Sequence, residues 1–155
     1  MHISIPARVS RLQALSCLTR GCAPALVAFL TQGGGAILKD ALATGCARDR
    51  SRALFVLGCH WPDVPPTLRA DYWTKVLPEV TACASASNAD EVTRESALGL
   101  LVTALSAGEL DQARALGLQR EMTDLEAHLT ALSGDELEWG QAQLHLAREI
   151  QHRLA

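Results

Sequence analysis

Apolar residues recur along this chain at intervals of three and four, the spacing that places them on one face of an α-helix. In residues 118–132, for example, Met122, Leu125, Leu129 and Leu132 follow this spacing. No segment shows the sustained alternation of apolar and polar residues that is typical of a half-buried strand. The pattern therefore predicts helices over residues 8–18, 25–30, 36–43, 50–59, 67–77, 80–84, 90–105, 109–116, 118–132 and 135–154.

Glycine and proline separate these predicted helices. Three prolines in residues 61–66 predict a rigid loop, and Pro78 is expected to kink its helix or to begin a new turn. The triplet Gly33–Gly35 is interpreted as a helix break. Its alternative is a phosphate cradle at a helix N-terminus, but no strand precedes it and Lys39 lies too far into the helix for a P-loop.

Composition supports an all-helical chain. The 155 residues include 25 alanines and 25 leucines, the two strongest apolar helix formers, while aromatic residues make up 4%. This length fits a single domain over residues 1–155. No apolar run approaches the roughly 18 residues of a membrane span, and Met1–Pro6 lacks the basic-then-apolar order of a signal peptide. A cytoplasmic location is therefore expected.

Four of the predicted helices resemble one another. The similar segments are 10–18, 49–57, 92–101 and, more weakly, 138–146. When they are aligned, alanines coincide at intervals of 39, 44 and 45 residues, at Ala14, Ala53, Ala97 and Ala142. A period of 40 to 47 residues with a helix pair per unit is typical of helical solenoids. We expect these small residues, together with Gly99, to lie where helices pack closely.

The chain thus resembles the armadillo/HEAT superfamily of helical repeats. The closest likeness is Gln32–Leu42, a glycine-led apolar helix, followed by Ala47–Gly58, a charged helix start with an Ala-Leu core. Further units match at 72–105 and 116–150, without the glycine pair. The resemblance implies an all-α, right-handed α-α superhelix of about three to four helix pairs. It also implies a non-enzymatic scaffold or adaptor that binds proteins in a groove lined by residues 50–59, 92–105 and 138–150.

The net charge of −3 conceals two opposed regions. Residues 1–60 contain seven basic and two acidic side chains, whereas residues 79–155 contain five basic and thirteen acidic ones. This polarity predicts an acidic protein partner at the N-terminal end, and it permits head-to-tail self-association. Nucleic-acid binding through the N-terminal arginines is the alternative, although an overall pI near 5.9 opposes nonspecific binding.

The candidate binding residues combine this basic cluster with aromatic side chains and one arginine of the predicted groove. Trp61 and Trp73 flank the proline-rich loop, either as buried filler between repeats or as exposed anchors. The complete set is Arg8, Arg11, Arg48, Arg50, Arg52, Trp61, Trp73 and Arg94.

A small helical enzyme or metalloprotein is the remaining alternative. The five cysteines occur at irregular spacing without a Cys-x2–4-Cys pair, so they are interpreted as reduced thiols in a helical core rather than as a disulfide framework or zinc site. Glu149 and His152 match the Glu-x-x-His spacing of di-metal bundles only once. No catalytic residue, metal site or cofactor is predicted.

Overall fold

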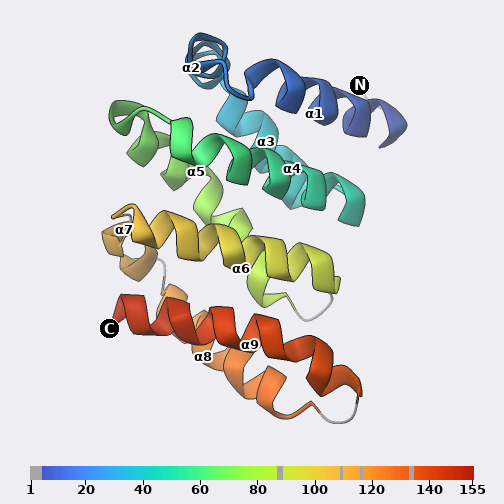
Figure 1. Ribbon diagram of the computed structural model, residues 1–155, viewed down its shortest axis with the longest axis vertical. Coiled ribbons are helices and arrows are strands. Elements are labelled where there is room, and N and C mark those ends of the chain that lie inside the picture. Colours follow the sequence, from blue (N-terminus) through green and yellow to red (C-terminus); the bar gives the residue numbers. More distant parts are fainter. Residues whose placement is uncertain (1–4, 87–88, 109, 116, 133–134) are drawn as a thin grey trace. The chain divides into compact units, whose positions relative to one another are not determined.

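The computed structural model describes residues 5–86, 89–108, 110–115, 117–132 and 135–155. Side chains are described from residue 12 onward, with those of residues 110, 112, 115, 135–137 and 139 also excluded. The described chain is helical and contains no strand (Figure 1). Its helices are α1 (Ile5–Thr19), α2 (Ala23–Thr31), α3 (Gly34–Thr44), α4 (Ala47–His60), the short 3-10 helix η1 (Trp61–Asp63), α5 (Pro66–Ser85), α6 (Glu91–Ser106), α7 (Leu110–Ala115), α8 (Leu118–Thr130) and α9 (Asp135–Leu154).

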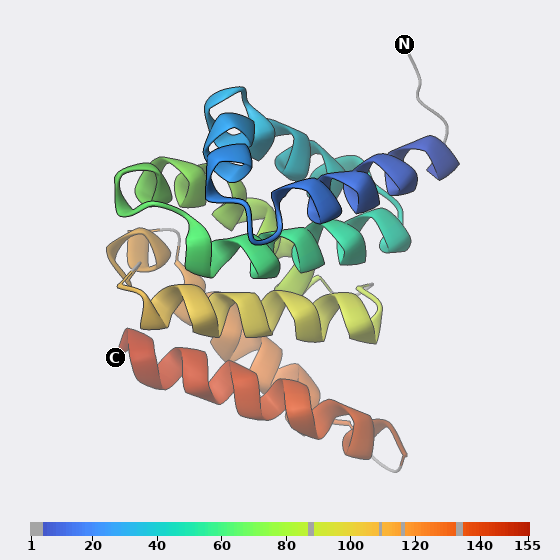
Figure 2. The ribbon, with the colours of Figure 1, turned by 45° about the horizontal axis from the view of Figure 1, so that its top comes forward.

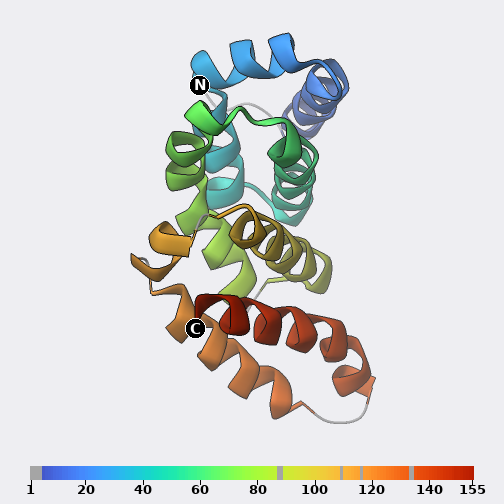
Figure 3. The ribbon, with the colours of Figure 1, turned by 60° about the vertical axis from the view of Figure 1, so that its left-hand side comes forward.

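The chain forms two compact units, Met1–Glu79 and Val80–Ala155. In the first unit, α4 packs against both α1 and α3, with the short α2 between α1 and α3 in the chain (Figure 2). In the second unit, α9 packs against both α6 and α8, and the short α7, which lies between α6 and α8 in the chain, contacts α8 and α9 (Figure 3). In each unit, therefore, one helix, α4 or α9, packs against two earlier helices of the same unit.

The turns of the two units correspond as well. All four described residues with positive φ are glycines. Gly21 (φ 68°) follows α1 as Gly108 (φ 98°) follows α6, and Gly33 (φ 90°) precedes α3 as Gly117 (φ 73°) precedes α8. Only glycine adopts this left-handed conformation without steric cost. The matching glycines are 87 and 84 residues apart in the sequence.

The predicted packing role of the aligned alanines is only partly correct. Ala53 and Ala97 are fully buried, but Ala14 and Ala142 are exposed. A Cβ added to Gly99 would meet nothing within 4 Å, so this residue does not permit a close approach either. The close approach occurs instead at Gly34, where the Phe29 ring lies so near the backbone that an added Cβ would be 2.3 Å from it. Sequence similarity thus identified comparable helices without identifying their buried faces.

The predictions for the proline-containing segments can also be compared with the structure. The expected loop after α4 begins with the helical turn η1, whose second residue is a proline that needs no hydrogen-bond acceptor for its nitrogen. Pro78, which was expected to kink its helix or to begin a new turn, lies inside the single helix α5. Pro78 is exposed, and the helix accommodates it at the cost of one backbone hydrogen bond. Among the described helices, none combines the length and apolarity that a bilayer crossing requires.

Candidate functional site

The predicted arginine cluster divides into residues with different environments. Arg8 and Arg11 lie on α1, but their side chains are outside the described part of the structure. Arg48 is exposed in the first turn of α4. Arg50 is half-buried, and its Nε donates a hydrogen bond of 3.1 Å to the Leu42 carbonyl near the end of α3. Arg50 therefore fixes the α3–α4 turn, whereas Arg48 is exposed and Arg52 is half-buried.

An exposed phenylalanine lies between two arginines on the surface formed by α1 and α4. The Phe55 side chain is 46% exposed. The guanidinium carbons of Arg20 and Arg52 lie 5.9 Å and 6.0 Å from its ring centroid, within cation–π range. Arg52 is one helical turn before Phe55, while Arg20 reaches the ring from the end of α1. These three residues are called the Phe55 patch.

Arg52 is among the binding residues predicted from the sequence, whereas Phe55 is not. A single aromatic in an apolar helix is ordinarily assigned to the core, and its exposure depends on how α4 packs. The sequence feature that could have identified Phe55 is the Arg-x-x-Phe spacing, which places both side chains on one helix face. Leu18 of α1, 70% exposed, adds apolar surface to the same unit.

Trp61 and Trp73 are core residues and are not exposed anchors. Their side chains are 2% and 0% exposed, and their ring centroids lie 4.8 Å apart. Trp61 also stacks on Tyr72, and the Arg69 guanidinium covers its ring at 5.7 Å. Of the two alternatives, buried filler is therefore correct: Trp61 lies in η1 and packs against Tyr72 and Trp73 of α5.

Arg94 is also unsuited to bind a partner directly. Its side chain is 9% exposed and joins three segments of the second unit. Nη1 donates to Gln143 of α9 at 3.2 Å, and Nη2 donates to the Ala86 carbonyl after α5 at 3.0 Å. Hydrogen bonds from a charged, buried donor contribute more than neutral surface ones. We therefore assign Arg94 to the internal structure of this unit.

The five cysteines differ in their exposure to solvent. The expectation of core thiols holds for Cys83 alone: Cys59 is half-buried, and Cys17, Cys22 and Cys46 are exposed. None of these five described cysteines forms a disulfide bond. No group of three or more His, Cys, Asp or Glu side chains suited to a metal ion occurs among the described residues.

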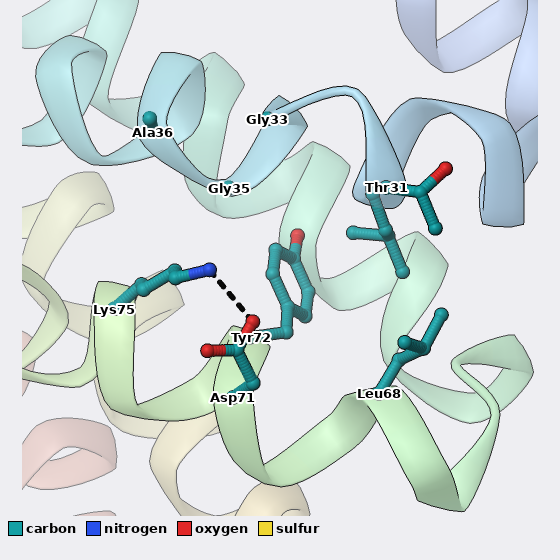
Figure 4. A pocket seen from close by; sticks show the side chains of 9 residues that line it. Thr31, Gly33, Gly35, Ala36, Leu68, Asp71, Tyr72 and Lys75 are labelled. Carbon is teal, nitrogen blue, oxygen red and sulfur yellow. Dashed lines mark hydrogen bonds and ion pairs between the residues drawn. The ribbon is translucent and has the colours of Figure 1, made fainter.

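A cavity of about 210 Å³ lies between the start of α3 and the side of α5. Figure 4 shows Tyr72 and Lys75 of α5 facing Gly33 and Gly35 across it. Tyr72 is 3% exposed, and its hydroxyl has no hydrogen-bond partner among the described residues. Burial raises the pKa of Tyr72, so the hydroxyl stays protonated at neutral pH. The Lys75 Nζ pairs with Asp71 at 2.6 Å.

Comparison of the chain with protein-family models, curated proteins and solved structures gives no match. The Phe55 patch and the cavity beside Tyr72 are the two features of the first unit whose chemistry suits the binding of another molecule.

Proposed function

We propose that this chain is a non-enzymatic protein-interaction module that binds an acidic partner through the Phe55 patch. The carrying observation is the exposed Phe55 ring between the Arg20 and Arg52 guanidinium groups. Phenylalanine, like the other aromatic residues, and arginine are enriched at protein interfaces relative to the rest of the surface. An acidic helix or strand with an apolar residue at its centre would match the patch in charge and polarity.

The charge of the unit favours the same class of partner. Residues 1–79 carry nine basic and five acidic side chains, a net charge of +4. A positive field attracts acidic surfaces and speeds their association. The contacts that hold Phe55 are worth only about 0.5–1 kcal/mol each at an exposed site. A partner that covers the ring would therefore displace little existing stabilisation.

We further propose an armadillo/HEAT-like repeat architecture for the module. The supporting observations are the shared helix order of α1–α4 and α6–α9 and the left-handed glycines at matching turns. A short helix followed by two longer ones, as in α2–α4, is the arrangement expected of an armadillo unit. Stacked helix pairs of this kind present an extended surface for protein binding.

Affinity purification with wild-type protein and two variants tests the proposal. Phe55→Ser removes the aromatic ring, whereas Val92→Ser is a matched control because Val92 is 63% exposed on α6. We expect wild type and V92S to retain acidic proteins that elute near 0.5 M salt. F55S should not retain these proteins. Truncating a central aromatic of an interface costs about 2 kcal/mol or more, which corresponds to about thirtyfold in affinity.

Two results would contradict the proposal. One is an identical set of retained proteins with F55S and wild type, provided that both have the same far-ultraviolet circular dichroism. The other is retention of nucleic acid in place of protein, detected as nuclease-sensitive material, which would favour the arginine-dependent alternative. Arg48→Ala and Arg52→Ala suit that second measurement, while Arg50 is avoided because it holds the α3–α4 turn.

A further inference from the structure

The cavity beside Tyr72 has hydrogen-bond donors on two sides. On one side, α3 begins at Gly34, directly after the left-handed Gly33. The amides of Gly34 and Gly35 are the first two of an 11-residue helix, and within the described chain neither has a hydrogen-bond partner. The helix dipole adds a partial positive charge of about half a unit at this end. Unpaired amides and dipole together favour a negatively charged group.

Glycine suits this arrangement because the tyrosine ring lies close against the helix start. A Cβ on Gly35 would lie 3.2 Å from Tyr72 Cδ2, closer than an ordinary contact. Gly35 is itself buried, and both Gly33 and Gly35 line the cavity. The absent side chain therefore leaves the backbone of the α3 N-terminus accessible from the cavity.

On the other side, α5 contributes the Tyr72 hydroxyl and the Lys75 ammonium group. The hydroxyl is buried without an acceptor, and leaving such a group unpaired costs about 1–3 kcal/mol. Figure 4 shows the ring between Gly35 and Thr31, with its oxygen directed toward the segment that leads into α3. The neutral phenol can donate its proton, and lysine has only donors to offer. The Tyr72 hydroxyl and the first amides of α3 thus present donors without an acceptor, while Lys75 adds an ammonium group that is paired with Asp71.

We propose that this cavity binds a small oxyanion, a phosphate or carboxylate group, between the α3 N-terminus, the Tyr72 hydroxyl and the Lys75 ammonium group. The volume of about 210 Å³ is several times that of one water, yet below the roughly 300–1,000 Å³ of cavities for drug-sized ligands. The bound group is therefore a small ion or the terminal group of a larger molecule. This site is separate from the Phe55 patch and does not depend on it.

Asp71 is the one carboxylate at the cavity, and it limits the affinity. It accepts a hydrogen bond from Lys75 at 2.6 Å, so the pair is close to neutral. Both side chains are more than half exposed, and such ion pairs contribute little net energy. An incoming oxyanion can share the ammonium group, because lysine has three donor hydrogens. Removing the Asp71 charge should consequently strengthen binding.

Nuclear magnetic resonance of the full-length, ¹⁵N-labelled chain tests the proposal with inorganic phosphate and, in a second arm, acetate. Both titrations run at pH 7.5 with ionic strength held constant by sodium chloride. We expect saturable shifts of the Gly34 and Gly35 amides with at least one anion, at low millimolar concentrations. The anion that saturates first identifies phosphate or carboxylate as the preferred group. Absence of saturable shifts with both anions up to 50 mM would overturn the proposal.

Variants distinguish the proposed site from general anion attraction. Tyr72→Phe removes one hydrogen bond to a charged ligand, which should weaken binding about tenfold. Its thermal midpoint should not fall, because the lost hydroxyl has no partner in the free protein. Lys75→Met should also weaken binding, whereas the matched control Lys39→Met, on α3 but outside the cavity, should not. Asp71→Asn should tighten binding several-fold. Wild-type affinity in folded Y72F would overturn the assignment.

Discussion

At the scale of single residues, His60 is held in one protonation state by its surroundings. The side chain is 1% exposed, and its Nε2 is hydrogen-bonded to the Thr19 hydroxyl. That hydroxyl already donates to the Leu15 carbonyl at 2.7 Å, so Nε2 must be the donor to it. Nδ1 is therefore unprotonated, and it has no partner among the described residues. A second proton would place an unpaired charge between α1 and α4.

We predict that acid destabilises the protein through His60. Burial lowers the pKa of His60 below its ordinary value of 6.5, and the nearby Asp63 charge only partly opposes this. Since the unfolded chain then binds the proton more readily, the free energy of unfolding is maximal above pH 6.5 and falls as the pH drops below it. One proton limits the slope to about 1.4 kcal/mol per pH unit.

Urea denaturation at pH 7.5, 6.5 and 5.5 measures this dependence. His60→Gln should remove most of it, while His152→Gln, at an exposed position on α9, should leave it unchanged. A pH dependence that persists in H60Q would assign the effect to other groups.

Candidate site residues were only partly predictable because neighbouring arginines look equivalent in the sequence. Arg50 and Arg52 are separated by one residue, yet one binds a backbone carbonyl and the other contacts an aromatic ring. Their roles depend on the α3–α4 turn and on Arg20, which is over 30 positions earlier. Arg94 shows the same limit, since its partner Gln143 is 49 residues away. Charge indicated the region, and tertiary contacts decided the individual roles.

At the scale of helices, two glycines in helical positions should respond oppositely to alanine. Gly99 has open space where a Cβ would be, so Gly99→Ala should stabilise α6 by about 0.5–1 kcal/mol through reduced unfolded-state entropy. Gly34→Ala should destabilise by about 1–3 kcal/mol, because its Cβ would collide with the Phe29 ring, which itself contacts His60. Thermal denaturation followed by circular dichroism measures both effects. Stabilisation by G34A would show that Phe29 moves without cost.

Helix positions were predictable from the sequence to within a few residues, since local periodicity and capping determine them. Asp90 illustrates this, because its carboxylate accepts the Thr93 amide and begins α6 where the pattern indicated. Buried faces were less predictable. Ala14 and Ala97 occupy equivalent sequence positions, but the first is exposed and the second is buried. Which face a helix buries depends on the neighbours it acquires, and these come from elsewhere in the chain.

At the scale of the whole molecule, the charge asymmetry follows the division into two units. The first unit has a net charge of +4, whereas residues 80–155 carry five basic and twelve acidic side chains, a net charge of −7. We predict weak head-to-tail association at low salt. Sedimentation velocity in 20 mM sodium chloride should show a concentration-dependent shift to larger species, which 0.5 M salt abolishes.

A charge variant provides the control for this association. Arg48→Glu reverses one exposed charge in the basic unit and should weaken the association, while Arg148→Glu in the acidic unit should not weaken it. Oligomers that are unaffected by 0.5 M salt would remove the electrostatic explanation.

The division into two units also bears on how the chain folds during synthesis. Contacts within each unit join helices close in the chain, such as α3 with α4 and α8 with α9. Short loops close at small entropic cost, and contacts of this kind favour fast folding. At about 5–20 residues per second, synthesis of Val80–Ala155 occupies several seconds after Glu79 is made. The first unit therefore has time to fold while the second is still being translated.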